Sequence, residues 1–250
     1  MTSKEGYELL KAGASELGID VNESQWDCFY EYMTLLKDWN TRMNLTSITE
    51  DAAIITKHFV DSLTIAPYIK ESLEGGAPKT LCDIGTGAGF PGIPLKIMFP
   101  ELKVLLVDSL NKRLLFLDEV IARLGLQKVE TVHMRAEDFG RDPRFRNKTD
   151  FSTARAVAPM NVLLELCTPA LKPGGIFLAM KGGRDEGDFA AAAKKLSVRL
   201  EKTDRMTITT AEGGLSEQTE AERIIYIFKK TSPTAPMYPR KAGMPSKSPL

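Results

Sequence analysis

The chain has 250 residues, of which 43% are hydrophobic, and this is enough apolar material for a sizeable core. Its 33 basic and 33 acidic residues give a formal net charge of zero, so no overall positive field attracts nucleic acid. No apolar run is long enough to cross a membrane, and the amino terminus lacks the apolar core of a signal peptide. From these features we expect neither a membrane protein nor a secreted one.

The cysteines and histidines give no sign of a metal or redox centre. Cys28, Cys82 and Cys167 lie far apart, without the spacing of a metal or redox motif. An odd number of unpaired cysteines is typical of the reducing cytoplasm. Neither His58 nor His133 has a neighbour suited to sharing a metal ion. We therefore expect a cytoplasmic protein without a metal.

The first part of the chain has helical periodicity. Residues 4–18 and 24–40 have the spacing of amphipathic helices, and 50–70 predicts a third helix. From residue 79 strands and helices alternate. The predicted strands are 79–84, 103–107, 128–133, 149–154, 175–181, 203–210 and 223–229. The predicted helices are 91–99, 111–124, 159–171 and 186–199.

This alternation predicts an α/β fold, with a mostly parallel sheet covered by helices on both faces. The segment LKPGG at 171–175 is expected to be a turn that leads into the fifth strand. A polar loop near 213–220 is all that separates the last two strands. We therefore expect these two strands to form an antiparallel hairpin.

A glycine-rich loop, DIGTGAGFPG at 83–92, follows the first predicted strand and precedes a helix. Gly85, Gly87 and Gly89 permit sharp turns and the close approach of a ligand, as in nucleotide-binding α/β folds. A dinucleotide fingerprint would have its third glycine where Phe90 stands, which disfavours a nicotinamide enzyme. The pattern, which begins with Asp83, instead resembles motif I of class I S-adenosylmethionine-dependent methyltransferases. The alternative is a glycine-rich turn without a ligand.

The end of the second predicted strand supplies a second element of such a site. Asp108 lies about 20 residues beyond the glycines, the offset at which an acid meets the ribose of a bound nucleotide. A carboxylate can accept hydrogen bonds from both ribose hydroxyls. We predict this role for Asp108; the alternative is a charge at the start of the next helix.

The C-terminal tail is basic and rich in proline. From Lys229 onward it has five basic residues and no acidic one. We expect residues 232–250 to form neither a helix nor a central strand and to suit a phosphate backbone, a solvated tail being the alternative. The other basic run, at 141–148, is predicted to be an ordinary solvated loop.

Several motifs, in order along the chain, together resemble one family. They are NLTSI (44–48), HFVDSL (58–63), DIGTGAGFPGIPLKI (83–97), DSLNKRLLFL (108–117), RAED (135–138), STARAVAPM (152–160) and YPRKAGMPSKSPL (238–250). On these motifs the chain is similar to the glucose-inhibited division protein B family, the small-subunit ribosomal RNA methyltransferases called RsmG. The resemblance implies a class I (Rossmann-like) methyltransferase domain at 75–231 with a seven-stranded sheet. It also implies an N-terminal helical segment at 1–74 that helps form the substrate pocket, and a basic tail at 232–250.

The resemblance implies methyl transfer from S-adenosylmethionine to N7 of guanine 527 in the 530 loop of 16S rRNA. We expect the rRNA to be met within the small ribosomal subunit, naked rRNA being the alternative, and the protein to act as a monomer. The residues agree in part. The segment ARAVAPM lacks the Asp/Asn-Pro-Pro-aromatic motif of amine methyltransferases, and Cys167 stands too late to be a pyrimidine-C5 nucleophile. Guanine N7 has a free lone pair, so its methylation needs positioning more than a base. The alternatives are another RNA, a small molecule, or an RNA-binding protein without a cofactor.

The resemblance also assigns site residues. Those expected to bind the cofactor are Asp83, Gly85, Gly87, Gly89, Phe90, Asp108, Ser109, Arg155 and, at the adenine edge, Ala136 and Glu137. Those expected to line the target-base pocket or act in catalysis are Asn44, His58, Asp61 and Arg155. The candidates for contact with RNA phosphates, which do not come from the resemblance, are Arg113, Lys181, Arg240 and Lys241, an ordinary surface charge being an equal alternative for each. For His58 a hydrogen-bonded core histidine is an equal alternative, and Glu137 could be an exposed loop acid.

Overall fold

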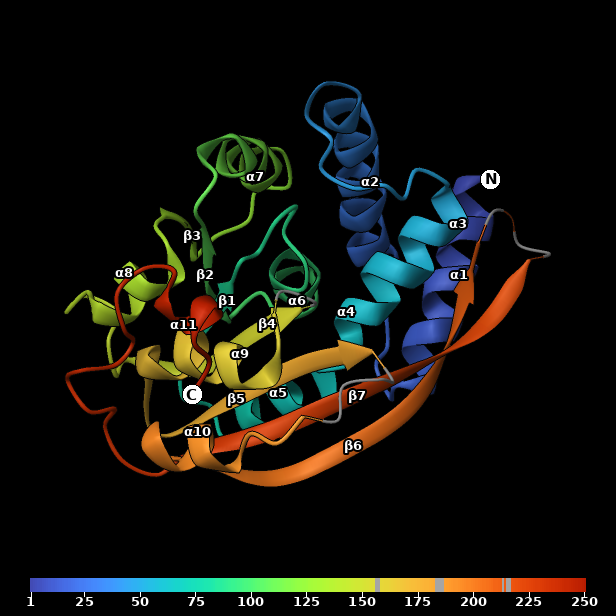
Figure 1. The fold of residues 1–250 in the computed structure, drawn as a ribbon. Helices are drawn as coiled ribbons and strands as arrows, with labels where there is room; N and C mark the ends of the chain where they lie inside the picture. Colours follow the sequence, from blue (N-terminus) through green and yellow to red (C-terminus); the bar gives the residue numbers. More distant parts are fainter. Residues whose placement is uncertain (156–157, 183–186, 213, 215–216) are drawn as a thin grey trace.

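Seven strands form one sheet at the centre of the computed structural model, which describes all residues except 156–157, 183–186, 213 and 215–216 (Figure 1). The order is β3-β2-β1-β4-β5-β7-β6, and β7 alone runs antiparallel to its neighbours β5 and β6. The strands are β1 (Thr80–Ile84), β2 (Lys103–Asp108), β3 (Val129–His133), β4 (Thr149–Arg155), β5 (Leu171–Gly182), β6 (Val198–Ala211) and β7 (Gln218–Lys230). The predicted α/β class, the mostly parallel sheet and the terminal hairpin are confirmed.

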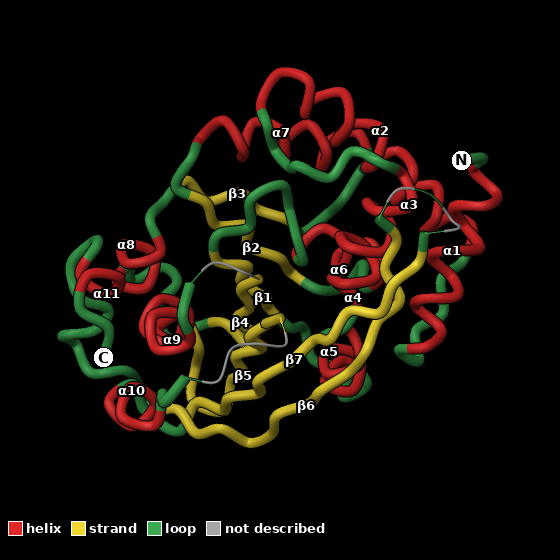
Figure 2. Tube along the Cα trace, turned by 45° about the vertical axis from the view of Figure 1, so that its right-hand side comes forward, coloured by secondary structure: helices red, strands yellow, loops and turns green. Residues whose placement is uncertain are grey.

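Helices cover both faces of the sheet (Figure 2). One layer contains α1 (Ser3–Glu16), α2 (Glu23–Met43), α5 (Ala66–Leu73), α6 (Gly92–Met98) and α7 (Asn111–Arg123). The other layer contains α8 (Ala136–Arg141), α9 (Met160–Cys167), α10 (Ala190–Lys195) and α11 (Met244–Lys247). Within the part of the chain that the structure describes, none of these helices is long and apolar enough to pass through a bilayer.

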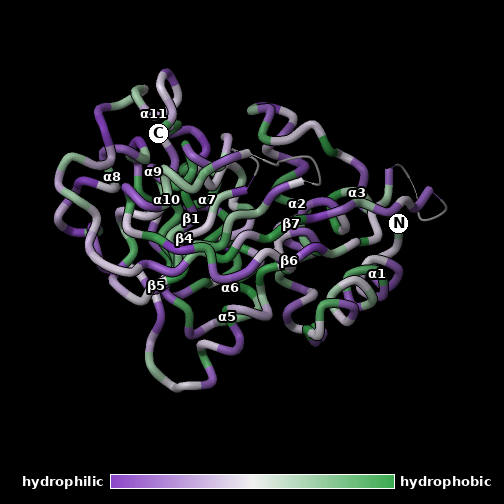
Figure 3. Tube along the Cα trace, turned by 60° about the horizontal axis from the view of Figure 1, so that its bottom comes forward, coloured by the Kyte–Doolittle hydropathy of each residue, from purple (hydrophilic) through white to green (hydrophobic). Residues whose placement is uncertain are grey.

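Alternation along the strands separates the core into two apolar clusters, one on each face of the sheet. On β5, Phe177 and Ala179 belong to the cluster beneath α9, whereas Leu178 and Met180 belong to the cluster beneath α6. This period of two is what a strand buried on both faces requires. Hydrophobic segments accordingly gather around the central strands in Figure 3. The helices of residues 1–74 share the larger cluster with the sheet.

The helix predicted at 50–70 is not continuous. It consists of α3 (Asp51–Ile54), a π-helical segment η1 (Ile55–Val60) and α4 (Asp61–Leu63), and α5 begins as a separate helix. Pro67 in the first turn of α5 has no backbone N–H for an earlier carbonyl, which explains the break after α4. The π-helical segment places one more residue in each turn than an α-helix does.

The helix predicted at 159–171 and the turn predicted at 171–175 are also corrected. α9 ends at Cys167 and continues as the 3-10 segment η2 (Thr168–Ala170). β5 already begins at Leu171, because its pairing with β4 shifts register between Thr149 and Phe151 and so accommodates the LKPGG residues. Gly174 adopts φ 83° there, a left-handed conformation that glycine adopts without strain. Helix α8 was not predicted, and α10 is shorter than the helix predicted at 186–199, whose first residue lies outside the described residues.

The C-terminal tail is folded against α8 and α9 (Figure 1). The predicted absence of helix is wrong for α11, where Pro245 stands in the first turn, a position that tolerates proline. The loop at 141–148 holds the tail in place. Arg146 donates to the carbonyl oxygens of Thr234, Ala235 and Tyr238, and Arg141 donates to that of Pro239. Arg141 and Arg146 therefore have a structural role that the composition of the 141–148 run did not indicate.

Replacing Arg240 by alanine is expected to destabilise the fold by about 3 kcal/mol, because it removes the partner of a buried charge. Arg240 donates to both carboxylate oxygens of Glu165, at 2.6–3.1 Å, and Glu165 is fully buried. Urea unfolding would measure the loss. The exposed pair Arg42–Asp38 is the control, and Arg42→Ala should cost about 0.5 kcal/mol or less. Equal losses in the two variants would contradict this role of Arg240.

Candidate functional site

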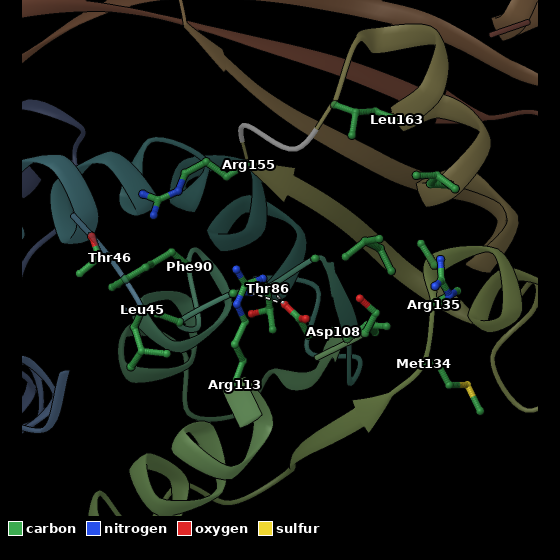
Figure 4. A pocket seen from close by; sticks show the side chains of 18 of the residues that line it. Leu45, Thr46, Thr86, Phe90, Asp108, Arg113, Met134, Arg135, Arg155 and Leu163 are labelled. Atoms are coloured by element: carbon green, nitrogen blue, oxygen red, sulfur yellow. Dashed lines mark hydrogen bonds and ion pairs between the residues drawn. The ribbon is translucent and has the colours of Figure 1, made fainter. Parts of the chain in front are cut away.

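A cavity of about 530 Å³ opens at the carboxyl ends of β1, β2 and β4, where parallel α/β sheets bind their ligands (Figure 4). Its volume lies in the range of small-molecule sites. Ten of the predicted residues line it: His58, Gly85, Gly87, Phe90, Asp108, Ser109, Arg113, Ala136, Glu137 and Arg155. The sequence did not single out Leu45, Thr46, Ile84, Thr86, Ala88, Val107, Met134, Arg135, Leu163 and Leu166. Six of these residues stand inside matched motifs, which was the available signal: Leu45, Thr46, Ile84, Thr86, Ala88 and Arg135.

The glycine loop forms one wall of the cavity. Gly85, Gly87 and Gly89 have φ values of 72°, 61° and 100°, which L-residues rarely adopt. A Cβ atom added to Gly87 would have only the carbonyl oxygen of Gly85 nearby, at 4.0 Å, so this glycine leaves space for a ligand. Gly89 does not line the cavity. A Cβ atom there would come within 2.7 Å of the Tyr32 hydroxyl, so the predicted ligand contact is replaced by tight packing under the loop.

Asp83 shapes the loop from behind. Its carboxylate is fully buried, and Oδ2 accepts hydrogen bonds from the Thr86 hydroxyl (2.8 Å) and the Gly92 N–H (2.9 Å). Burial raises the pKa of this carboxyl to about 6. Asp83 is not among the residues that line the cavity. The structure therefore gives it a supporting position in place of the predicted contact with the cofactor.

Asp108 presents its carboxylate at the centre of the cavity (Figure 4). Oδ2 accepts from the Gly87 N–H (3.0 Å) and from Arg113 Nη1 (3.2 Å), and Oδ1 accepts from the Leu110 N–H (2.8 Å). Only 3% of the Asp108 side chain is exposed. These bonds fix the orientation of the carboxylate. Arg113, predicted to contact RNA phosphate, instead forms an ion pair within the cavity wall, because the first turn of α7 carries it toward Asp108.

Helix α8 supplies the opposite end of the cavity through Ala136 and Glu137. Glu137 is 9% exposed, so it is not the exposed loop acid of the alternative interpretation. Its Oε1 accepts a hydrogen bond of 2.8 Å from the backbone N–H of Gly243 in the C-terminal tail. This contact joins segments that are far apart in the sequence.

His58, Phe90 and Arg155 form a second wall. The His58 ring is stacked on Phe90 with ring centres 4.4 Å apart, and the Arg155 guanidinium carbon lies 4.9 Å from the Phe90 centre. Arg155 Nη2 lies 3.3 Å from His58 Nδ1, and an arginine can only donate, so Nδ1 accepts. The proton of the neutral ring is then on Nε2, which donates to the Thr46 hydroxyl (2.8 Å). Both ring nitrogens are therefore occupied.

Lowering the pH from 7 towards 4 is expected to destabilise the protein through His58. Burial, followed by the positive charge of Arg155, lowers the pKa of this ring from 6.5 to about 3. As the pH falls below 6.5 the unfolded chain binds the proton first, so the stabilisation present above pH 6.5 is lost progressively towards pH 3. Urea unfolding at several pH values should show a smaller acid loss in His58→Gln. His133→Gln, a change on the exposed face of β3, is the control and should behave as the wild type; an unaltered acid loss in His58→Gln would contradict the assignment.

Asp61 and Asn44 do not line the cavity, contrary to the prediction. Asp61 is buried beside it, where Oδ2 accepts from Arg155 Nη1 (3.0 Å) and Oδ1 accepts from Arg223 Nε. Asp61 therefore positions Arg155. Asn44 is exposed and ends α2 in the left-handed conformation, with φ 47°, which asparagine tolerates. It leads the chain directly into Leu45 and Thr46.

The residues predicted to contact phosphates occupy different environments. Arg240 is engaged by Glu165, so the structure gives it a structural role in place of the predicted phosphate contact. Lys181 Nζ donates to the carbonyl oxygen of Ala158 (2.5 Å). Lys241 is exposed, one residue beyond the Arg240–Glu165 ion pair. For Lys181 and Lys241 the phosphate contact stays a prediction.

The chain is similar to known proteins along nearly its whole length. A family model described as rRNA small subunit methyltransferase G matches residues 25–218. The protein named ribosomal RNA small subunit methyltransferase G from Acetivibrio thermocellus is 48% identical over 97% of this chain and 96% of its own length. The protein of the same name from Desulfitobacterium hafniense is 48% identical over 98% of both.

The comparison with solved structures concerns the fold. A putative RNA methyltransferase from Pyrococcus horikoshii superposes with a TM-score of 0.51 at 11% identity, over 79% of this chain and 98% of that one. This similarity shows the Rossmann-like methyltransferase fold alone. The family match confirms the methyltransferase class and S-adenosylmethionine as the cofactor. From the model match and from relatives that cover nearly its whole length, the chain belongs to the rRNA small subunit methyltransferase G family.

Proposed function

We propose that this protein methylates N7 of a single guanine in the 530 loop of 16S rRNA within the small ribosomal subunit. The names of the family and of the relatives support ribosomal RNA as the acceptor. The cavity fits the cofactor, since it has a suitable volume, an open face at Gly87 and an oriented carboxylate at Asp108. When bound, S-adenosylmethionine supplies an activated methyl group.

In this proposal each part of the cavity wall holds one part of the cofactor. Gly85 and Gly87 leave room for close approach of the ligand to the main chain. Asp108 accepts hydrogen bonds from the ribose hydroxyls. Ala136 and Glu137 read the adenine edge, the carboxylate accepting from the amine. Phe90, His58 and Arg155 form the wall against which the guanine is placed.

The observation that carries the N7 assignment is that the side chains beside that wall, His58 and Asp61, are poorly suited to accept a proton. His58 has both ring nitrogens in hydrogen bonds and a pKa of about 3, so it is a poor base at neutral pH. The Asp61 carboxylate is shared by two arginines. Methylation of an exocyclic amine ends with the loss of a proton, whereas N7 offers a lone pair and has no proton to lose. A site that positions without taking a proton favours N7, since alignment alone can contribute about 7–11 kcal/mol.

The test uses small ribosomal subunits and naked 16S rRNA, both from a strain in which this gene is deleted. Each is incubated with the purified protein and methyl-labelled S-adenosylmethionine, and the nucleosides are then separated. We expect label in 7-methylguanosine alone, at one position mapped by chemical cleavage. Label in an exocyclic amine would overturn the N7 assignment, and the absence of label from both substrates would overturn 16S rRNA as the acceptor. Comparing the two substrates decides whether the assembled subunit is needed.

A further inference from the structure

The backbone of the C-terminal tail makes a hydrogen bond to a residue that lines the cavity. The N–H of Gly243 lies 2.8 Å from Oε1 of Glu137, a residue that lines the cavity and is 9% exposed. No other hydrogen bond of the Glu137 carboxylate is present among the described residues, so Oε2 remains for a ligand. The hydrogen bond from the tail therefore determines the orientation of the Glu137 carboxylate.

The structure on both sides of Gly243 is well anchored. On the preceding side Arg240 binds the buried Glu165, and Pro239 packs against Gly140, where a Cβ atom would come within 3.0 Å of the proline ring. On the following side α11 packs against α9. The position of the Gly243 N–H is thus fixed by contacts other than its hydrogen bond to Glu137.

A carboxylate held by one strong hydrogen bond can accept a second from a ligand without first losing rotational freedom. Hydrogen bonds to an ionised group are about twice as strong as neutral ones, and a pre-oriented group avoids the entropy cost of ordering on binding. An unanchored glutamate at the first turn of α8 would have to be ordered by the cofactor itself.

We propose that the C-terminal tail is part of the methyl-donor site, with Gly243 as the positioning residue that orients Glu137 towards the adenine amine. This inference rests on the proposed adenine-edge role of Glu137. Because binding couplings are reciprocal, a bound cofactor also stabilises the tail. The exposed Lys241 lies two residues before Gly243, so contact of the tail with RNA would act on the same hydrogen bond.

The test variant is Gly243→Ala, because it disturbs the backbone alone. Gly243 has φ 81°, and a Cβ atom there meets nothing within 4 Å, so the substitution adds strain without a clash. Gly174→Ala is the matched control, since Gly174 has φ 83°, equally open space and a position on β5 outside the cavity wall. Both variants should lose similar stability. Calorimetry with S-adenosylhomocysteine should show affinity about tenfold weaker in Gly243→Ala and within twofold of the wild type in Gly174→Ala.

A double-mutant cycle with Glu137→Ala separates positioning from general loosening of the fold. If Gly243 acts through Glu137, then Gly243→Ala should cause no further loss of affinity in the Glu137→Ala background. S-inosylhomocysteine, which lacks the amine, should bind the wild type and Gly243→Ala equally.

The outcomes distinguish the role of the tail from the assignment of the cavity as the cofactor site. Wild-type affinity in Gly243→Ala, or additive losses in the cycle, would overturn the role of the tail and leave the methyltransferase function intact. Failure of the wild-type protein to bind S-adenosylhomocysteine would instead overturn the assignment of the cavity.

Discussion

Replacing Asp108 by alanine is expected to weaken S-adenosylmethionine binding by about 10²–10⁴-fold. Each hydrogen bond from a ribose hydroxyl to this carboxylate contributes about 1.5–3 kcal/mol, and every 1.4 kcal/mol is tenfold in affinity. The carboxylate is 3% exposed and already oriented by the Gly87 and Leu110 N–H groups, so little of this energy is lost to water or to ordering. Isothermal titration calorimetry with the purified protein measures the change.

The control for Asp108 must separate ribose binding from damage to the loop. Asp108→Asn keeps an acceptor for the Gly87 N–H and should lose less affinity than Asp108→Ala. Glu130→Ala removes an exposed acid from the neighbouring strand β3 and should bind as the wild type does. Retention of wild-type affinity by Asp108→Ala, in a protein with an unaltered circular dichroism spectrum, would refute the ribose assignment.

Replacing Arg155 by alanine is expected to lower kcat/KM for methyl transfer by about 10³-fold. Arg155 donates to the carbonyl oxygens of Lys57 and His58 and to Asp61, and it lies over Phe90. Its loss removes a positive donor from the cavity and releases the segment that carries His58. A missing donor alone costs about 10²–10³-fold, and misplacement of a reactant adds to that. Initial rates with small ribosomal subunits measure the effect.

Arg223 provides a matched control, because it binds the other oxygen of Asp61 and does not line the cavity. Arg223→Ala leaves the same carboxylate with one partner, so it should cost comparable stability but about tenfold or less in kcat/KM. Arg155→Lys keeps the charge without the planar fork of donors and should fall between the wild type and alanine. Equal activity losses in Arg155→Ala and Arg223→Ala would show that Arg155 acts only through stability.

Local patterns predicted most of the sheet and the centre of the site. The apolar runs of β1 and β2 and the acid that ends β2 are properties of adjacent residues, and the glycine spacing carries its backbone geometry with it. Asp83 and Gly89 show the limit of this reasoning. Both belong to the motif, but only the fold around them decides that Asp83 faces Gly92 and that Gly89 faces Tyr32.

The errors in the tail and in the 141–148 run concern contacts between segments that are distant in the sequence. In the sequence Arg240 is one of several basic residues in the tail. Its partner Glu165 is 75 residues away, so no local pattern indicates the ion pair. Arg146 likewise belongs to a run that resembles a solvated loop, until Thr234 and Tyr238 supply carbonyl oxygens. Composition counts charges, whereas the fold determines which of them are paired.

The π-helical segment η1 makes this part of the chain sensitive to length. Each residue of an α-helix turns the chain by about 100°. Deleting one residue between Ile55 and Val60 would restore regular winding and turn either His58 or Asp61 by that angle away from Arg155. The effect of a substitution on this segment depends on the volume and polarity of the new side chain. An insertion or deletion would instead move His58 and Asp61 apart, and both of these residues hold Arg155. Among related chains, the spacing between these two residues should vary less than the residues themselves.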